Sequence, residues 1–274
     1  MSLNEAGFLS PDIQRWISKH RRECQDAFRI AEAINRAGVK TLYASQASKD
    51  DHLQLMVTLL FARILSHYQS AMILAERGAV VSAKALVRVM LEATFTLGAC
   101  VKDSVFLGIY VKDDRKRQAD LIEALVDLSP EETSVPRDEL EQLRQQAISL
   151  RSEMKADKQP PVSAFSTAKR AGLLDFYRLF YVPYCTAVHT AVRDLSSHVN
   201  EGPDGNIASL KWGPESVEVE DLVDAAIQIL FVAAQLTLQI FPQPDQENEF
   251  ERLWAEQKPR VEEKGQRKGR PGAK

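Results

Sequence analysis

The chain has 274 residues, of which 45% are hydrophobic and 27% charged, and its formal net charge is −3. These totals allow one large domain or two small ones and exclude a polycation that coats nucleic acid, although a local basic site stays open. Its three cysteines, with no CxxC pair, exclude a disulfide framework or a cysteine zinc site. The N-terminal residues do not form the basic segment followed by an apolar segment that is typical of a secretory signal, so we expect a cytoplasmic protein.

The N-terminal part of the chain predicts two long helices. Ser10 and Pro11 supply an N-cap and a first-turn proline, and Gly38 is expected to end this first helix, because glycine commonly follows a helix C-terminus. A second helix is predicted from Ser48, as its N-cap, to Gly78.

Two later stretches are apolar enough to raise the question of a membrane span. They cover Val80–Val101 and Leu222–Phe241, but charged and amide residues interrupt both. Central charges are costly in a bilayer, so both stretches predict buried helices of a soluble bundle, with no membrane partner. A helix from about Val105 becomes amphipathic, and a strongly charged helix is predicted over 136–156 as a projecting or peripheral element.

The last third of the chain is predicted to be helical with one interruption. A short helix is expected at 163–172 and a longer one at 175–199, which Pro183 should kink or split. One short strand or extended loop is predicted at 207–212, followed by a last core helix at 218–241. Strand signals are otherwise nearly absent, which favours an all-α helix bundle.

The elements together predict one main domain with additions at both ends. A main helical bundle is assigned to 45–242, with an N-terminal helical extension at 1–44 and peripheral helices. A marginal C-terminal helix is expected at 243–257. Proline, glycine and basic residues then predict a disordered basic tail at 258–274.

A polar stripe runs along the otherwise apolar helix that begins at Val80. Lys84, Arg88 and Glu92 are spaced four apart and therefore share one narrow face. The stripe is either ion-paired at the bundle surface or faces a polar pocket between helices, and a charge removed from water needs a partner in both cases. A closed apolar pocket lined by Arg88 and Tyr184 would favour a small ligand.

A second cluster of polar residues lies late in the chain. His189 and Arg193 are four apart and share a helix face, with Ser197 roughly on it. His198 follows Arg193 by five residues, so on a regular helix it points about 140° away. A long arginine side chain, or a helix that ends near Ser197, would bring the two groups together. A lone helical histidine is, however, more often structural than catalytic.

The spacing Arg193-Asp194-x-x-x-His198 resembles the Arg-polar-x3-His signature of the HEPN ribonuclease superfamily. Those helical bundles occur among toxins, abortive-infection and phage-defence factors and CRISPR effectors. The resemblance implies metal-independent RNA cleavage, with His198 as general acid or base and Arg193 stabilising the scissile phosphate. Glu92 or Asp194 would orient the arginine, and His189 competes with His198. It also implies RNA as a partner, a homodimer, no cofactor and no metal.

The same arginine-to-histidine spacing occurs once more, near the N-terminus. Arg15 and His20 repeat it, but Trp16 follows the arginine where the signature has a small polar residue. Other chemistries have little support in the sequence, which contains no HExxH pair, no glycine-rich phosphate loop after a strand and no nucleophile elbow.

A longer resemblance covers about 45–242 and is to an uncharacterised bacterial family of unknown function. It rests on an Arg-x-x-x-Glu helix, a Val-His step and three stretches: Val80–Gly98, Phe176–Val199 and Ser209–Pro214. The resemblance implies a fold more than an activity. Two alternatives to the ribonuclease therefore stay open: a non-enzymatic interaction or regulatory protein, with an antitoxin-like partner or role, and a helical bundle that binds a small ligand.

Overall fold

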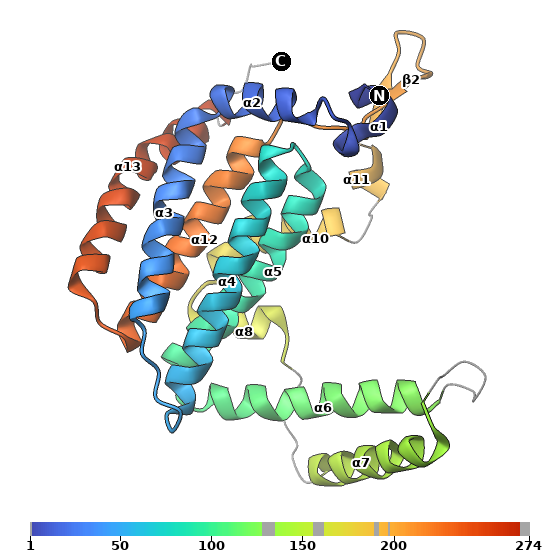
Figure 1. The fold of residues 1–274 in the computed structure, drawn as a ribbon, viewed down its shortest axis with the longest axis vertical. Coiled ribbons are helices and arrows are strands. Elements are labelled where there is room, and N and C mark those ends of the chain that lie inside the picture. The colour runs from blue at the N-terminus through green and yellow to red at the C-terminus, as the bar shows by residue number, and fades with distance from the viewer. Residues whose placement is uncertain (1, 128–134, 156–161, 189–191, 197, 269–274) are drawn as a thin grey trace.

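A helix bundle forms the centre of the molecule (Figure 1). The computed structural model describes residues 2–127, 135–155, 162–188, 192–196 and 198–268. Four long helices pack together, and a fifth, α13, covers α3 and α12. Their bounds are α3 (Gln25–Ala44), α4 (His52–Glu76), α5 (Val80–Lys102), α12 (Val219–Ile240) and α13 (Pro244–Lys268). The predicted all-α class is confirmed.

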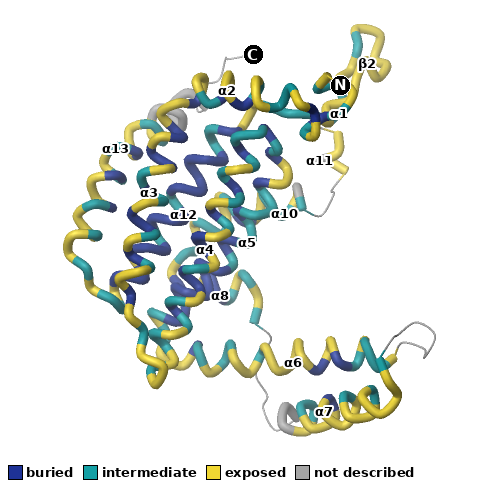
Figure 2. Tube along the Cα trace, viewed as in Figure 1, coloured by how far each residue is buried: buried dark blue, intermediate teal, exposed yellow. Residues whose placement is uncertain are grey.

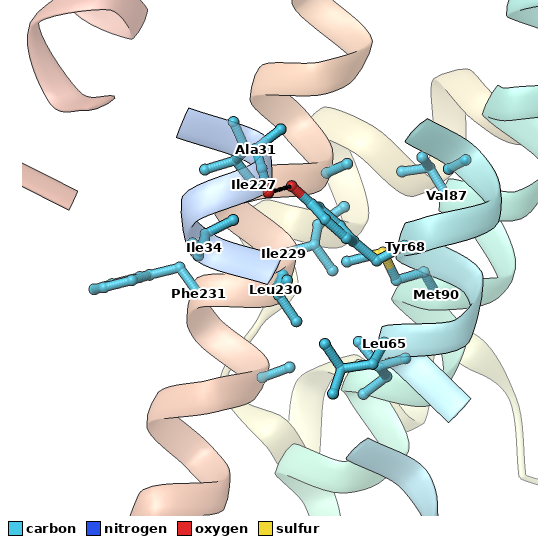
Figure 3. Packing of buried hydrophobic residues seen from close by; sticks show 14 of the residues in the cluster. Ala31, Ile34, Leu65, Tyr68, Val87, Met90, Ile227, Ile229, Leu230 and Phe231 are labelled. Carbon is cyan, nitrogen blue, oxygen red and sulfur yellow. Dashed lines mark hydrogen bonds between the residues drawn. The ribbon is translucent and has the colours of Figure 1, made fainter. Parts of the chain in front are cut away.

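The core lies where α3, α4, α5 and α12 meet (Figure 2). Side chains from these helices interdigitate in Figure 3, with Leu65, Met90 and Leu230 almost or fully buried. Tyr68 lies among them, and its hydroxyl donates to the carbonyl oxygen of Ala31 at 2.9 Å. Since a buried hydroxyl without a partner is costly, this bond fixes how α3 and α4 are placed against each other.

The remaining helices lie outside this bundle. Helices α8 (Ala164–Ala171) and α10 (Val182–Val188) pack on α5. Helices α6 (Phe106–Val126) and α7 (Arg137–Lys155) form a hairpin that leaves the bundle as an arm (Figure 1). The charged helix predicted over 136–156 is therefore a projecting element, as expected.

The first long helix differs from its prediction. It is preceded by α1 (Leu3–Ala6) and is broken at Cys24 into α2 (Ile13–Glu23) and α3, and Gly38 lies inside α3 rather than at its end. A Cβ at Gly38 would come within 2.8 Å of the Cδ2 atom of Leu65. The glycine is thus used for close packing of α3 on α4, and the predicted helix end is wrong.

Helix α3 belongs to the bundle core, whereas the sequence predicts an extension at 1–44. Its residues Phe28, Ile30 and Ile34 are buried in the same cluster as those of α4, α5 and α12. The N-cap of α4 also differs from its prediction. Asp51, not Ser48, caps this helix, because its carboxylate accepts hydrogen bonds from the first-turn amides of α4.

The helix predicted over 175–199 is irregular next to Pro183. It consists of α9 (Leu174–Phe176), a π-helical turn at Tyr177–Tyr181, α10 and α11 (Val192–Ser196). A proline has no amide to donate to the preceding turn, and a wider π turn next to it accommodates the missing bond. This irregularity points Tyr181 toward α5, where it takes part in the site described below.

A strand pair closes this part of the chain. Strand β1 (Val199–Glu201) pairs antiparallel with β2 (Ile207–Leu210), with a register irregularity after Asn200. The strand at 207–210 agrees with the sequence prediction, whereas its partner begins at a residue predicted to be helical. The turn residues between the two strands bring them together. The sequence analysis does not predict this strand pairing.

Helix α13 continues well past the predicted boundary at 257. Gln257 donates to the Oδ1 atom of Asp224 on α12 at 2.8 Å, and Arg260 lies 3.9 Å from the same carboxylate. The helix continues through Pro259 to Lys268. The composition of 258–274 predicts disorder because it contains few apolar residues, but polar contacts with Asp224 order its first part.

Two helices, α4 and α12, are long and apolar enough to cross a membrane by length and composition alone. Both lie in the bundle, and 72% of the most apolar window of α12 is buried there. A core helix of a soluble protein passes the same test, so the signal for a membrane span is weak.

Candidate functional site

Arg88 is the centre of a polar cluster between α5 and the π turn that leads into α10. Its guanidinium lies 3.0 Å from the Glu92 carboxylate, and its Nη2 atom donates to the Tyr181 hydroxyl at 3.2 Å. Its Nε atom is 3.2 Å from the Cys185 sulfur, and its Cζ atom lies 5.2 Å from the centroid of the Tyr181 ring. Tyr181 in turn donates to Glu92 at 2.7 Å.

The cluster satisfies its own charges. Burial lowers the pKa of Arg88, but the hydrogen bond with Cys185 and the charge of Glu92 outweigh it and raise the pKa. Burial and the hydrogen bond to Glu92 raise the pKa of Tyr181 well above its usual value. The raised pKa values favour a charged arginine and a neutral tyrosine, whose hydroxyl can both accept from Arg88 and donate to Glu92.

Lys84, at the N-terminal end of the polar stripe on α5, contacts the residue that precedes α12. The Nζ atom of Lys84 lies 2.7 Å from the carboxylate of Glu218. Glu218 has a positive φ of 67°, which is unfavourable for a residue with a side chain. Tyr184 is largely buried nearby, and burial together with Asp221 and Glu218 raises its pKa.

The structure brings together only part of the predicted α5 site. Arg88 and Glu92 do face a neighbouring element, but their partners are Tyr181 and Cys185, not Tyr184. A closed apolar pocket lined by Arg88 and Tyr184 stays a prediction. Tyr181 and Cys185 are four residues apart, and this helical spacing could have indicated that they share one face.

An open cleft of about 510 Å³ lies beside the cluster, between α4, α5, α6 and the start of α8. Glu92 and Tyr181 form one edge, while Arg63 and Arg117 bring two guanidinium groups to it. Arg117 is paired with Asp113 at 3.1 Å. The cleft also presents apolar and hydroxyl side chains, including those of Leu60, Phe95, Tyr110, Ser163 and Thr167.

The second predicted cluster is only partly visible. Arg193 and Asp194 lie on α11, but their side chains, like residues His189 and Ser197, fall outside the part of the chain that the structure describes. His198 is described and half-buried, just before β1. Whether it converges with Arg193 stays a prediction.

His198 contacts Lys211, the residue that follows β2. Its carbonyl oxygen accepts from the Lys211 amide at 2.7 Å, and its Nδ1 atom lies 3.1 Å from the Lys211 carbonyl oxygen. A carbonyl oxygen can only accept, so Nδ1 carries the proton and Nε2 of the neutral ring keeps its lone pair. A backbone bond that fixes a histidine in this way also sets the tautomer of catalytic histidines.

Residues 54–207, more than half of the chain, match the model of a family of unknown function, DUF5677. The chain belongs to the DUF5677 family. No curated protein and no solved structure matches it. The predicted resemblance to an uncharacterised helical family is thereby confirmed.

The DUF5677 region runs from α4 to the start of β2 and contains both candidate clusters, the arm and His198. It does not contain α3 or α12, which bury the inner faces of α4 and α5. The matched region therefore lacks part of its own core, and residues 54–207 on their own would expose apolar surface.

The other arginine-to-histidine pair of this DUF5677 protein has a structural role. His20 is 1% exposed, and its ring packs against Trp16 in a tilted arrangement with the ring centroids 4.6 Å apart. Burial lowers its pKa. A histidine enclosed in this way cannot reach a phosphate. The same arginine-to-histidine spacing therefore gives a buried histidine at position 20 and a half-buried one at position 198.

Within the described ranges, no group of three or more histidine, cysteine, aspartate or glutamate side chains could hold a metal ion. Cys24 and Cys100 are buried, and Cys185 is occupied by Arg88. The polar side chains of the α5 cluster are arranged to pair with each other.

Proposed function

We propose that this DUF5677 protein binds RNA and cleaves it without a metal, as a HEPN-like ribonuclease of toxin or defence type in the cytoplasm. The observation that carries the proposal is the bond between Nδ1 of His198 and the Lys211 carbonyl, which leaves Nε2 as a base. The resemblance of Arg193-Asp194-x-x-x-His198 to the HEPN signature supplies the chemistry.

The reaction needs no external nucleophile, because RNA carries a 2′-hydroxyl. Nε2 of His198 takes the proton of this hydroxyl, whose oxygen attacks the adjacent phosphorus. The bond from phosphorus to the 5′ oxygen breaks, leaving a 2′,3′-cyclic phosphate and a 5′ oxygen that takes up a proton. In a homodimer, a protonated His198 of the second copy supplies this proton.

Arg193 stabilises the charge that develops on the phosphate oxygens. Since Glu92 already accepts from Arg88 and Tyr181, we assign the orientation of Arg193 to Asp194 rather than to Glu92. The cluster around Arg88 then supports α10, the helix that leads toward α11, and takes no part in the chemistry.

The test uses the purified full chain and an end-labelled single-stranded RNA in the presence of chelator. We expect fragments that end in a 2′,3′-cyclic phosphate, and we expect His198→Ala and Arg193→Ala to abolish them. His52→Ala is the matched control, because His52 is an exposed histidine at the start of α4. Intact RNA with the wild-type protein, or equal cleavage by all variants, would remove the proposal.

A second candidate function is the binding of a small phosphorylated polyol in the open cleft. In the part of the chain that the structure describes, no hydrogen bond or ion pair occupies Arg63, and its guanidinium shares the cleft with Arg117 and Glu92. Two guanidinium groups suit a phosphate, and Glu92, Ser163 and Thr167 suit hydroxyl groups. A cleft of about 510 Å³ is large enough for such a molecule.

Thermal unfolding with glucose 6-phosphate tests this candidate, with glucose and inorganic phosphate as separate arms. Glucose 6-phosphate should raise the melting temperature of the wild type and not that of Arg63→Gln. Arg144→Gln, on the exposed face of α7, is the control and should respond like the wild type. The absence of a shift, or the same shift in Arg63→Gln, would reject the cleft as a site.

A further inference from the structure

A stripe of basic residues lies on the outer face of α2. Arg15, Lys19 and Arg22 follow each other at helical spacing, and all three are exposed. The opposite face of the helix buries Ile17 and His20 against the bundle. The helix is thus fixed by its apolar face, and the three cations are presented to solvent in a defined row.

These cations line a groove of about 530 Å³, which Trp16 and Leu3 also line. Asp12 is the carboxylate among the lining residues and lies 3.7 Å from Arg15. Lys19 lies 3.6 Å from Glu23, with both side chains largely in water. Such exposed pairs are weak and exchange readily for a phosphate partner.

A second groove, of about 300 Å³, adjoins the first and shares Leu3 and Trp16 with it. Lys211 and Trp212, directly after β2, line its other side. Figure 1 shows α1, the start of α2 and the strand pair together at this end of the molecule. The two grooves therefore form one track from the middle of α2 to the residue that holds His198.

The two indoles on this track are held in place from below. A Cβ at Gly7 would come within 2.8 Å of the Trp212 ring, and Trp16 packs against the ring of His20. Trp212 is nevertheless 57% exposed. An indole that is fixed on one side and open on the other suits stacking of a planar base.

We infer that this track, from Arg15, Lys19 and Arg22 through Trp16 to Trp212, binds single-stranded nucleic acid. The cations contact successive phosphates and the indoles stack unpaired bases, which is the combination that binds single strands without reading their sequence. A duplex keeps its bases stacked inside and offers the indoles no partner. The choice of RNA over DNA rests on the proposed function, because the track ends at Lys211 beside His198.

The test measures binding separately from cleavage. The probe is a fluorescein-labelled 2′-O-methyl oligouridylate, which cannot be cleaved through its 2′ oxygen, and the readout is fluorescence anisotropy with the full chain. We expect the dissociation constant to rise with salt and to rise about tenfold in Arg15→Glu/Arg22→Glu. Trp212→Ala should raise it about fivefold or more, because one stacked base is lost.

The control is Arg137→Glu/Arg144→Glu on α7, which changes the net charge equally and has the same seven-residue spacing. It should bind like the wild type. Equal weakening by both double variants, or no binding by the wild type at low salt, would overturn the inference. Binding of the oligouridylate without any cleavage of natural RNA would instead reject the ribonuclease and leave the track in place.

Discussion

Two helices of this molecule carry charged stripes of nearly the same spacing and use them in opposite ways. On α5, the side chains of Lys84 and Arg88 are each 18% exposed and bind partners on other elements. On α2, the side chains of Arg15 and Lys19 are 87% and 71% exposed and contact nearby carboxylates of the same helix region. Position in the fold, not spacing, thus decides whether a charge stabilises the structure or is available to a ligand.

The difference follows from what covers each helix. Helix α5 is surrounded by α4, α8, α10 and α12, so its polar stripe has to be satisfied by protein groups. Helix α2 buries one face and leaves the other to water, which satisfies its charges at little cost. If this comparison is correct, substitutions on α5 should reduce stability, and those on α2 should reduce binding.

The largest effect is expected for Arg88→Ala. The substitution leaves Glu92 and Tyr181 without the guanidinium that they bind and opens space beside Cys185. Because the arginine is mostly buried, we expect a loss of about 3 kcal/mol in the free energy of unfolding. Urea denaturation followed by circular dichroism measures it. A loss below about 0.5 kcal/mol would mean that the α5 stripe resembles an exposed surface pair.

A smaller effect is expected for Tyr181→Phe, which keeps the ring over Arg88 and removes only the hydroxyl. That hydroxyl donates to Glu92 and accepts from Arg88. We expect a loss of about 1 kcal/mol, the typical value of a hydrogen bond within a protein. Combined with Arg88→Ala in a double-mutant cycle, the two losses should be less than additive, and full additivity would contradict the network.

Much of the fold could be predicted from the sequence, because long apolar periods follow directly from burial. The helix at Val80–Lys102 has the bounds that its apolar pattern predicts, and the projecting charged helix is recognisable by its lack of an apolar face. The errors arise where one residue type has two roles. Gly38 can end a helix or allow close packing, and only the position of Leu65 on another helix decides which.

The candidate site is less predictable, since it depends on how segments distant in the sequence meet. Arg88 and Glu92 can be identified from their spacing, but their partner Tyr181 lies in a π turn before Pro183 that the sequence does not indicate. The contact of His198 with Lys211 likewise requires a strand that the sequence does not indicate. The track on α2 is not predicted from the sequence, because the net charge of −3 does not reveal that cations are aligned on one face of a helix.

On the buried face of α2, opposite the exposed cations, His20 should make the stability of the protein depend on pH. Burial lowers the pKa of His20 below its unfolded value near 6.5, so the neutral ring is favoured in the folded state. Its contribution to stability is complete above pH 6.5 and is lost as the pH falls toward the folded pKa. We expect the melting temperature to fall between about pH 7.5 and 5.5, and His20→Leu to reduce this fall. A residual slope is expected from His67, whose pKa is lowered in the same way.

The smallest effect on stability is expected for Arg15→Ala/Arg22→Ala. Both side chains are exposed, and Asp12 lies 3.7 Å from Arg15, so the free energy of unfolding should change by less than about 0.5 kcal/mol. Binding of the oligouridylate should nevertheless weaken. A variant that unfolds more easily by over about 1 kcal/mol would show that the α2 stripe supports the fold as the α5 stripe does. If stability is unchanged and binding is weakened, the α2 cations act on the ligand alone. The α5 stripe would then stabilise the fold and the α2 stripe would bind nucleic acid.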